Sequence, residues 1–315
     1  MPLNQFARDV KEGLSSSPKR LSSKYFYDAR GDKLFQQIMH LDEYYLSRAE
    51  LEIFQTHKEA LLTIMDHGVP FRLVELGAGD GLKTKVLLKH FLQQGVDFSY
   101  APVDISPDVL EHLQENLLNE MPTLKIEPLA GDYFKVLADL KFKNHTHSVA
   151  FFLGSNIGNF LSDTAIAFLS SIHDNLQKGD YLMIGFDLKK DPKRILNAYN
   201  DAAGVTRAFN MNLLDRINRE LDANFDTSMF DHNPIYDPMT GQCRSYLISK
   251  QALEVHVGAL NETFSFREWE PIFMEVSKKY DLEEIQELAG KTGFRLVQNF
   301  FDQEHLFCDS VWEVI

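Results

Sequence analysis

The stretch that most constrains the fold is Phe71–Leu82, which reads FRLVELGAGDGL. An apolar run ends in the acid Glu75 and passes directly into three alternate glycines that begin at Gly77. Glycine allows positive φ angles and lets backbone approach a ligand without a Cβ in the way. The pattern therefore predicts a buried parallel strand that turns tightly into a helix near Lys83. Nucleotide-like ligands bind in the crevice beyond the carboxyl end of such a strand.

The spacing of these glycines narrows the choice of ligand. It is G-x-G-x-G, whereas dinucleotide-binding folds carry G-x-G-x-x-G. An E-x-G-x-G-x-G pattern after a strand resembles the first motif of S-adenosylmethionine (SAM)-dependent methyltransferases. Taken alone, the motif also fits a structural turn or another nucleotide. Glu75 can bond the backbone of this loop or the amino group of a cofactor.

From Phe71 onward, short apolar segments alternate with segments of helical periodicity. Strands that are apolar on both faces are expected where helices cover both sides of a sheet. The alternation predicts an α/β fold with a parallel, doubly wound sheet. The expected strands are 73–76, 100–105, 124–128, 148–153 and 181–187, and the expected helices are 83–94, 107–119 and 162–176.

The pattern changes after residue 192. Helical periodicity over 195–221 is broken near Gly204, and DPMTG at 237–241 predicts a hairpin between strand-like runs. The last 21 residues read as two strands joined near 302–304, which would complete the sheet. We therefore expect two domains. The first is a core of 58–196 plus 278–315, and the second is an α+β domain of 1–57 plus 197–277.

Charge and composition exclude several classes of function. The chain has 32 basic and 46 acidic residues, a formal charge of −14, which disfavours a nucleic-acid partner. Only Cys243 and Cys308 are present, too few for a disulfide framework or a zinc site, and they suit a reducing cytosol. No apolar run approaches the length of a membrane span, and the N-terminus lacks the apolar core of a signal peptide. We expect a cytoplasmic protein with no membrane partner.

Polar residues follow the expected strands at the edge where the glycines lie. Asp104 can accept two hydrogen bonds from a ribose diol, or it can cap the next helix. Asp132 and Tyr133 can recognise an adenine edge and ring, or they can form a surface turn. Asn159, within FLGSNIGNF, can hold a carboxylate or an amine, although asparagine is also common in turns. The eleven histidines fall in no metal-ligand spacing, so no metal site is expected.

Over nearly its whole length the chain resembles the ergothioneine-pathway histidine Nα-methyltransferases. The resemblance implies a seven-stranded class I (Rossmann-like) methyltransferase sheet and a second, substrate-binding α+β domain, with the amino acid between them. It also implies SAM as the cofactor. The matching segments are FYDARGDKLF (26–35), LDEYYLSRAE (41–50), VELGAGDGLKT (74–84), FFLGSNIGNF (151–160), AYNDAAGVTRAFN (198–210), NRELDANFD (218–226) and MEVSKKY (274–280).

The resemblance also assigns roles to residues. It implies that the cofactor is held by Gly77, Lys83, Asp104, Asp132 and Tyr133.

For the amino acid, it implies that Tyr27 lies near the reacting amine and that Tyr44 helps to bind the substrate. Asn159 and Tyr199 would hold the α-carboxylate and amine. Glu275 and Ser277 would bind the imidazole, and repeated transfer would give trimethylhistidine.

Several alternatives stay open. The three tyrosines can be packing residues, and Glu275 can be a solvated strand charge. Ser245 stands where a larger apolar pocket residue is expected, which leaves the side-chain selectivity open. The chain can instead methylate another amino acid or an aromatic amine such as tryptophan, or it can be a non-catalytic SAM-binding module. We expect a monomer.

Overall fold

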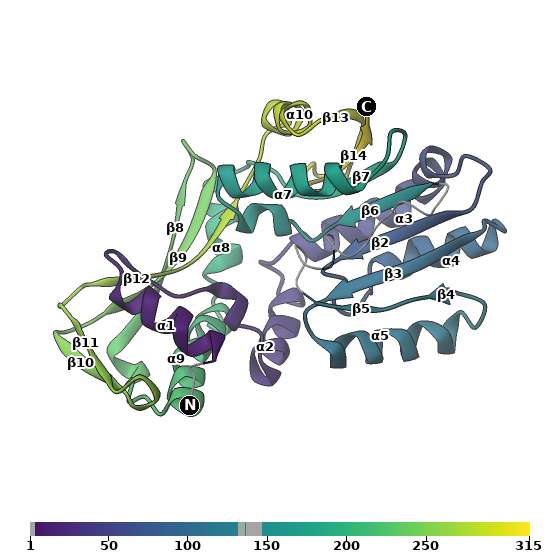
Figure 1. Ribbon diagram of the computed structural model, residues 1–315. Coiled ribbons are helices and arrows are strands. Elements are labelled where there is room, and N and C mark those ends of the chain that lie inside the picture. The colour runs from purple at the N-terminus through teal and green to yellow at the C-terminus, as the bar shows by residue number, and fades with distance from the viewer. Residues whose placement is uncertain (1–3, 132–135, 137–146) are drawn as a thin grey trace. The chain divides into compact units, whose positions relative to one another are not determined.

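The computed structural model describes residues 4–131, 136 and 147–315 (Figure 1). The chain divides into two compact units that are each built from separate stretches of sequence. Unit 1 comprises residues 1–45 and 190–277, and unit 2 comprises residues 46–189 and 278–315.

Unit 2 is built on one mostly parallel sheet with the strand order β13-β14-β7-β6-β2-β3-β4, in which β5 also pairs with β3. The last hairpin is antiparallel: β14 pairs with β7, and β13 pairs with β14. The remaining pairs are parallel. The strands are β2 (Phe71–Leu76), β3 (Phe98–Asp104), β4 (Lys125–Ile126), β5 (Leu129–Ala130), β6 (Ser148–Phe152), β7 (Tyr181–Asp187), β13 (Phe294–Phe301) and β14 (Phe307–Val314).

Two helices of unit 2, α5 and α10, begin where local capping chemistry predicts. Ser106 caps α5 by accepting from the Val109 N–H, and Pro107 occupies the first helical turn. Asp281 and Glu284 form a capping box at the start of α10. The helices are α3 (Leu46–Met65), α4 (Thr84–Gln93), α5 (Pro107–Glu120), α7 (Ser162–Asn175) and α10 (Leu282–Lys291), with a 3-10 turn at Asn156–Asn159.

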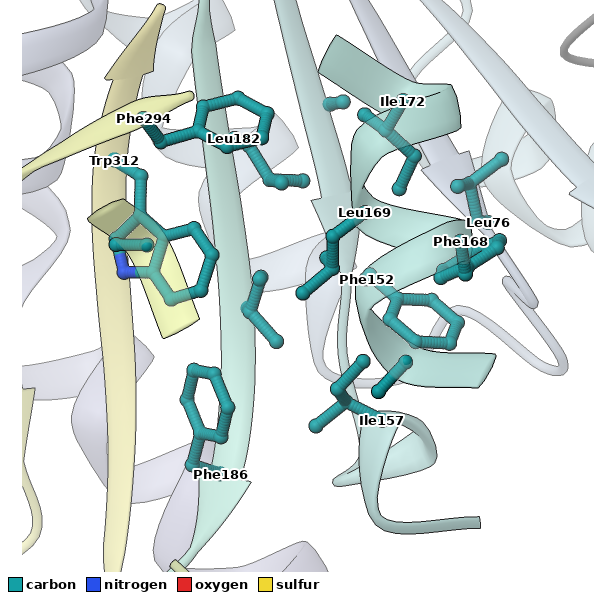
Figure 2. Packing of buried hydrophobic residues seen from close by; sticks show 14 of the residues in the cluster. Leu76, Phe152, Ile157, Phe168, Leu169, Ile172, Leu182, Phe186, Phe294 and Trp312 are labelled. Carbon is teal, nitrogen blue, oxygen red and sulfur yellow. The ribbon is translucent and has the colours of Figure 1, made fainter. Parts of the chain in front are cut away.

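The core of unit 2 joins the sheet to α7 and α10. Figure 2 shows Phe168, Leu169 and Ile172 of α7 at one side of the buried cluster and Trp312 of β14 at the other, with Leu182 of β7 between them. Phe152 packs on Phe168 with ring centroids 4.8 Å apart. Each of these side chains is fully buried, so this face of the sheet is covered as the apolar strand sequences predict.

Unit 1 is an α+β unit with its own core. Its sheet has the order β1-β12-β9-β8, and β10 and β11 form a separate hairpin. Residues from α1, α2 and α9 pack with these strands in one apolar cluster. The elements are α1 (Gln5–Ser15), β1 (Lys19–Arg20), α2 (Ala29–Met39), α8 (Pro192–Tyr199), α9 (Val205–Leu221), β8 (Phe230–Asp237), β9 (Gln242–Ser249), β10 (Leu253–Val257), β11 (Glu262–Phe266) and β12 (Pro271–Lys278).

The α/β fold predicted from the sequence is confirmed. The terminal hairpin, the hairpin at 237–241 and the helix break at Gly204, where φ is 73°, are present. The strand expected at 124–128 is instead divided into β4 and β5, both of which pair with β3. Within the residues that the structure describes, no helix is long and apolar enough to cross a membrane.

The division by contacts differs from the predicted domain boundaries in two places. The expected boundary at 57/58 lies inside α3, a single helix that packs on α4, β13 and β14, so residues 46–57 group with unit 2. Residues 190–196 group with unit 1, since α8 packs on β8 and β9. The boundary at 277/278 is the same in both divisions.

Candidate functional site

The glycine turn after β2 has the geometry that its sequence predicts. Gly77, Gly79 and Gly81 have φ angles of 76°, 54° and 64°. Residues other than glycine rarely adopt these positive values. The N–H groups of Gly77 and Ala78 donate to the carbonyl of Val103, at 2.8 and 3.2 Å. A Cβ added at Gly79 would meet no atom of the described residues within 4 Å. The backbone of this turn is therefore open to a ligand.

Asp104 lies at the end of β3, beside the same turn. Its Oδ2 accepts from the N–H of Gly79 at 3.2 Å, and its Oδ1 accepts from the N–H of Ser106 at 3.0 Å. A carboxylate has about four acceptor positions, and the described residues use two of them on this half-buried group. Asp104 thus orders the turn and keeps acceptor capacity that fits a ribose diol.

Glu75 has a different role from those considered for it. Its fully buried carboxyl accepts from the hydroxyls of Thr84, at 2.7 Å, and Tyr100. Burial raises the pKa of Glu75 to about 7, against the lowering effect of the two hydroxyls. These partners lie on α4 and β3, so Glu75 connects the strand to its neighbours, while Val103 and Asp104 hold the loop backbone.

Lys83 lies between the glycine turn and α4, and its ammonium forms an ion pair with Glu50 of α3. Burial alone would lower the pKa of Lys83, but the Glu50 carboxylate raises it. The other oxygen of Glu50 accepts from the N–H of Gly154, in the loop after β6, at 2.7 Å. Glu50 therefore joins two segments at the carboxyl edge of the sheet.

Sequence reasoning did not place Glu50 in the site. The sequence nevertheless indicated that Glu50 would be buried, because it lies four residues after Leu46 and four before Phe54 in α3, and both of these residues are buried. An acid in that apolar stripe must find a buried partner.

The loop after β6 is tightly shaped. Ser155 has a φ of 58°, and its hydroxyl accepts from the N–H of Asp187 at 3.2 Å. A Cβ at Gly158 would lie 2.7 Å from the carbonyl oxygen of Lys278. Asn159 ends this turn with an exposed side chain. Asp132 and Tyr133, which were predicted to contact the cofactor, lie outside the described residues.

In unit 1, β12 presents two of the predicted substrate residues. Glu275 and Ser277 are two apart on one strand and therefore share a face, whereas Met274 points into the apolar core. The hydroxyl of Tyr199, at the end of α8, donates to the Ser277 hydroxyl at 2.8 Å. The structure thus brings Tyr199 and Ser277 together beside Glu275.

The other two predicted residues of unit 1 belong to an aromatic cluster. The ring of Tyr27 packs edge-on against Phe35 and Phe209, each with centroids 5.5 Å away, and Tyr44 packs on Phe35 at 6.4 Å. Tyr27 is nevertheless 42% exposed. The rings of Tyr27 and Tyr44 thus both pack against Phe35. Asn159, the remaining predicted substrate residue, belongs to unit 2.

Ser245, on β9, is buried and lies opposite β8. Its hydroxyl is 3.4 Å from Nε2 of His232. Burial lowers the pKa of His232 to about 4, and Arg207 adds to the shift. The position therefore holds a neutral polar pair where an apolar residue was expected. Among residues 4–131, 136 and 147–315, no three His, Cys, Asp or Glu side chains gather to hold a metal ion.

Comparison with known proteins agrees with this geometry. A family model described as histidine-specific, SAM-dependent methyltransferase matches residues 6–314. A histidine N-alpha-methyltransferase of Mycolicibacterium smegmatis is 37% identical over 288 residues, which cover 91% of this chain and 88% of that protein. The Mycobacterium tuberculosis protein of the same name is 34% identical, covering 94% and 91%.

A third relative is longer. Ergothioneine biosynthesis protein 1 of Schizosaccharomyces pombe is 30% identical over 92% of this chain and 38% of its own length. Since the family model spans almost the whole sequence, the chain belongs to the histidine-specific, SAM-dependent methyltransferase family.

Proposed function

We propose that this protein transfers methyl groups from SAM to the α-amine of L-histidine, up to Nα,Nα,Nα-trimethylhistidine (hercynine). The observation that carries the proposal is the group on β12, where Tyr199 bonds Ser277 beside Glu275. The two bacterial relatives named histidine N-alpha-methyltransferase support it, because they align along almost the whole chain.

Unit 2 would hold the cofactor, and bound SAM supplies a methyl group activated on a sulfonium. The open backbone at Gly79 supports this role, as does the remaining acceptor capacity of Asp104. Our assignment of the cofactor contacts covers Gly77, Lys83, Asp104, Asp132 and Tyr133.

Unit 1 would supply most contacts to the amino acid. Glu275 would accept a hydrogen bond from an imidazole N–H, with Ser277 assisting. Tyr199, together with Asn159, would hold the α-carboxylate and amine, and Tyr44 would pack against the substrate. Tyr27 would orient the amine or accept its proton. A deprotonated amine is a good nucleophile, so the protein needs chiefly to position and desolvate it.

Selectivity for histidine would come from Glu275. A hydrogen bond to a charged group contributes about 1.5–3 kcal/mol. A substrate without a ring N–H would leave the carboxylate without that partner, which disfavours apolar side chains further.

Mass spectrometry of the purified protein with SAM and a mixture of the common amino acids tests the proposal. Histidine should gain one, two or three methyl groups. Transfer to another amino acid would leave the chemistry intact and reassign Glu275, and no transfer despite SAM binding would favour a binding module.

Glu275→Ala is the matched variant. It should lower kcat/KM for histidine by roughly tenfold to a hundredfold, the kinetic equivalent of the lost bond, with SAM affinity unchanged. Glu268→Ala, which removes an exposed acid of the same unit, is the control and should behave as the wild type. Wild-type histidine kinetics in Glu275→Ala would remove Glu275 from the pocket.

A second candidate is methylation of a bulkier aromatic amine such as tryptophan. The small Ser245 supports it, since an indole needs more space than an imidazole. Adding tryptophan to the substrate mixture decides between the two. We also propose that the protein acts as a monomer in the cytoplasm, and light scattering after size exclusion would measure its mass.

A further inference from the structure

A second carboxyl group lies beside Glu50 in the interior of unit 2. A Cβ built on Gly185 of β7 would lie 2.4 Å from Oε1 of Glu50, so the absent side chain makes room for this acid. Asp309 of β14 pairs directly with Gly185. Side chains of directly paired residues project from the same face, with Cβ atoms about 5 Å apart. The carboxyl of Asp309 therefore lies next to that of Glu50.

The two acids differ in their hydrogen-bond partners. Glu50 has one oxygen on the N–H of Gly154 and the other on the ammonium of Lys83. Both oxygens of Asp309 are buried, and no donor from the described part of the chain reaches either of them. A buried carboxylate without a donor is costly, which favours the neutral form of Asp309, whereas each oxygen of Glu50 already has a donor.

The balance of charges around Asp309 also favours its neutral form. The titratable groups around Asp309 are Glu50 from α3, Lys83 before α4, and Cys308 on its own strand. Glu75 of β2 instead accepts hydrogen bonds from the hydroxyls of Thr84 and Tyr100. One ammonium balances one carboxylate, and two acids that share a site do not both ionise. Burial and then Glu50 raise the pKa of Asp309 well above its usual value, against the opposing effect of Lys83.

We propose that Asp309 keeps its proton at neutral pH and donates a hydrogen bond to Glu50, and that Glu50 is a positioning residue that fixes Lys83 and Gly154 for the cofactor. The first half concerns the folded chain alone. The second half rests on the proposed cofactor role of Lys83.

Infrared spectroscopy of the unliganded wild-type protein tests the first half. A protonated carboxyl has a C=O stretch distinct from that of a carboxylate, and aspartate labelled with ¹³C at the side-chain carboxyl shifts only the aspartate bands. This labelling separates Asp309 from Glu75. At pH 7 we expect a protonated aspartate band that is missing in Asp309→Asn. A spectrum without such a band would overturn the proposal.

Glu50→Gln tests whether the proton depends on the pair. With Glu50 neutral, Asp309 becomes the acid that balances Lys83, so its protonated band should disappear at pH 7. A band that persists would show that burial alone holds the proton, which contradicts the sharing. Asp180→Asn removes another buried aspartate, which accepts from the N–H groups of Ser148 and Gln177, and it should leave the band unchanged.

Calorimetric titration with SAM tests the positioning role. Glu50→Gln should weaken SAM binding by about tenfold or more, the loss of one charge-assisted bond. Asp309→Asn keeps a donor toward Glu50, so its affinity should stay within about threefold of the wild type. Normal affinity in Glu50→Gln, or an equal loss in both variants, would overturn the role of Glu50.

These measurements need no methyl transfer. A failure of the proposed histidine reaction would therefore leave the infrared bands and SAM affinities as predicted. Conversely, an active enzyme without the aspartate band would refute only the inference about Asp309.

Discussion

The two units bury polar groups in different ways. Unit 2 encloses charges: Lys83 with Glu50, and Lys279 with Asp187 at 2.7 Å, where both side chains of the second pair are fully buried. In unit 1, the buried polar side chains include neutral ones, namely Asn210, Asn212, Ser245 and Ser277. Electrostatics thus contributes strongly to the shape of the proposed cofactor half. In the proposed substrate half, hydroxyl bonds and ring packing contribute more.

The strands show the same contrast. Every residue of β2 is buried, as expected for a parallel strand covered on both faces. Residues of β9 alternate between half-buried and buried, because one face packs on the core of unit 1. A strand buried on both faces leaves its ends as the place for chemistry, whereas a strand with one face away from the apolar core can present polar side chains such as Glu275 and Ser277 of β12 along its length.

The largest expected effect is the loss of stability when a buried ring is removed from the apolar core of either unit. Phe168 in unit 2 and Phe230 in unit 1 are both fully buried and touch other aromatic rings. Replacing either with alanine should reduce the free energy of unfolding by about 3–5 kcal/mol, as measured by denaturant titration. A much smaller loss in one variant would show that its core packs less tightly than the other.

The second prediction concerns pH and unit 2. The pKa of Glu75 is raised from 4.5 to about 7 in the folded protein, so the folded state binds more protons than the unfolded state between these values. Its contribution is fully present below pH 4.5 and is lost as the pH rises through 7. Glu75→Gln should remove this decline, about 3 kcal/mol in total. Denaturant unfolding of the wild type and Glu75→Gln at pH 4.5, 6 and 8 checks this prediction. The same dependence of the free energy of unfolding on pH in both proteins would contradict it.

The third prediction separates the two proposed binding roles. Asp104→Ala should weaken SAM by roughly tenfold to a hundredfold, or about 1.5–3 kcal/mol, because the carboxylate bonds to the ribose are lost. This is the converse of Glu275→Ala, in which SAM affinity is preserved. Asp108→Ala removes an exposed acid nearby and serves as the control. Unchanged titration of SAM into Asp104→Ala would refute the assignment.

The smallest effect is expected at His232 of unit 1, and it has the opposite sign to that of Glu75. Burial lowers the pKa of His232 from 6.5 to about 4, so the unfolded state binds more protons between these values. Stability from this residue is present above pH 6.5 and is lost as the pH falls toward 4. His232→Gln should flatten that slope. The change should be modest because the ring is partly exposed. A steeper dependence of the free energy of unfolding on pH in the variant would contradict the prediction.

Much of unit 2 could be predicted from local sequence. Apolar runs ending in glycine or an acid marked β2 and β3, and capping residues marked the start of α5. These signals are local, because a strand covered on both faces must be apolar throughout and a helix must satisfy its first N–H groups. The same logic placed Asp104 beside the glycine turn, where Gly79 donates to it.

The sequence alone therefore determined the α/β class, the glycine turn and the family of the chain, since each depends on residue types at short spacing or in matching segments. Only the tertiary structure showed that Glu75 bonds Tyr100 and Thr84, and that Glu50 meets Lys83, Gly154 and Asp309. Glu50 and Asp309 are 259 positions apart in the numbering. No local pattern encodes such a meeting, because it depends on the pairing of β14 with β7 and on the missing side chain at Gly185.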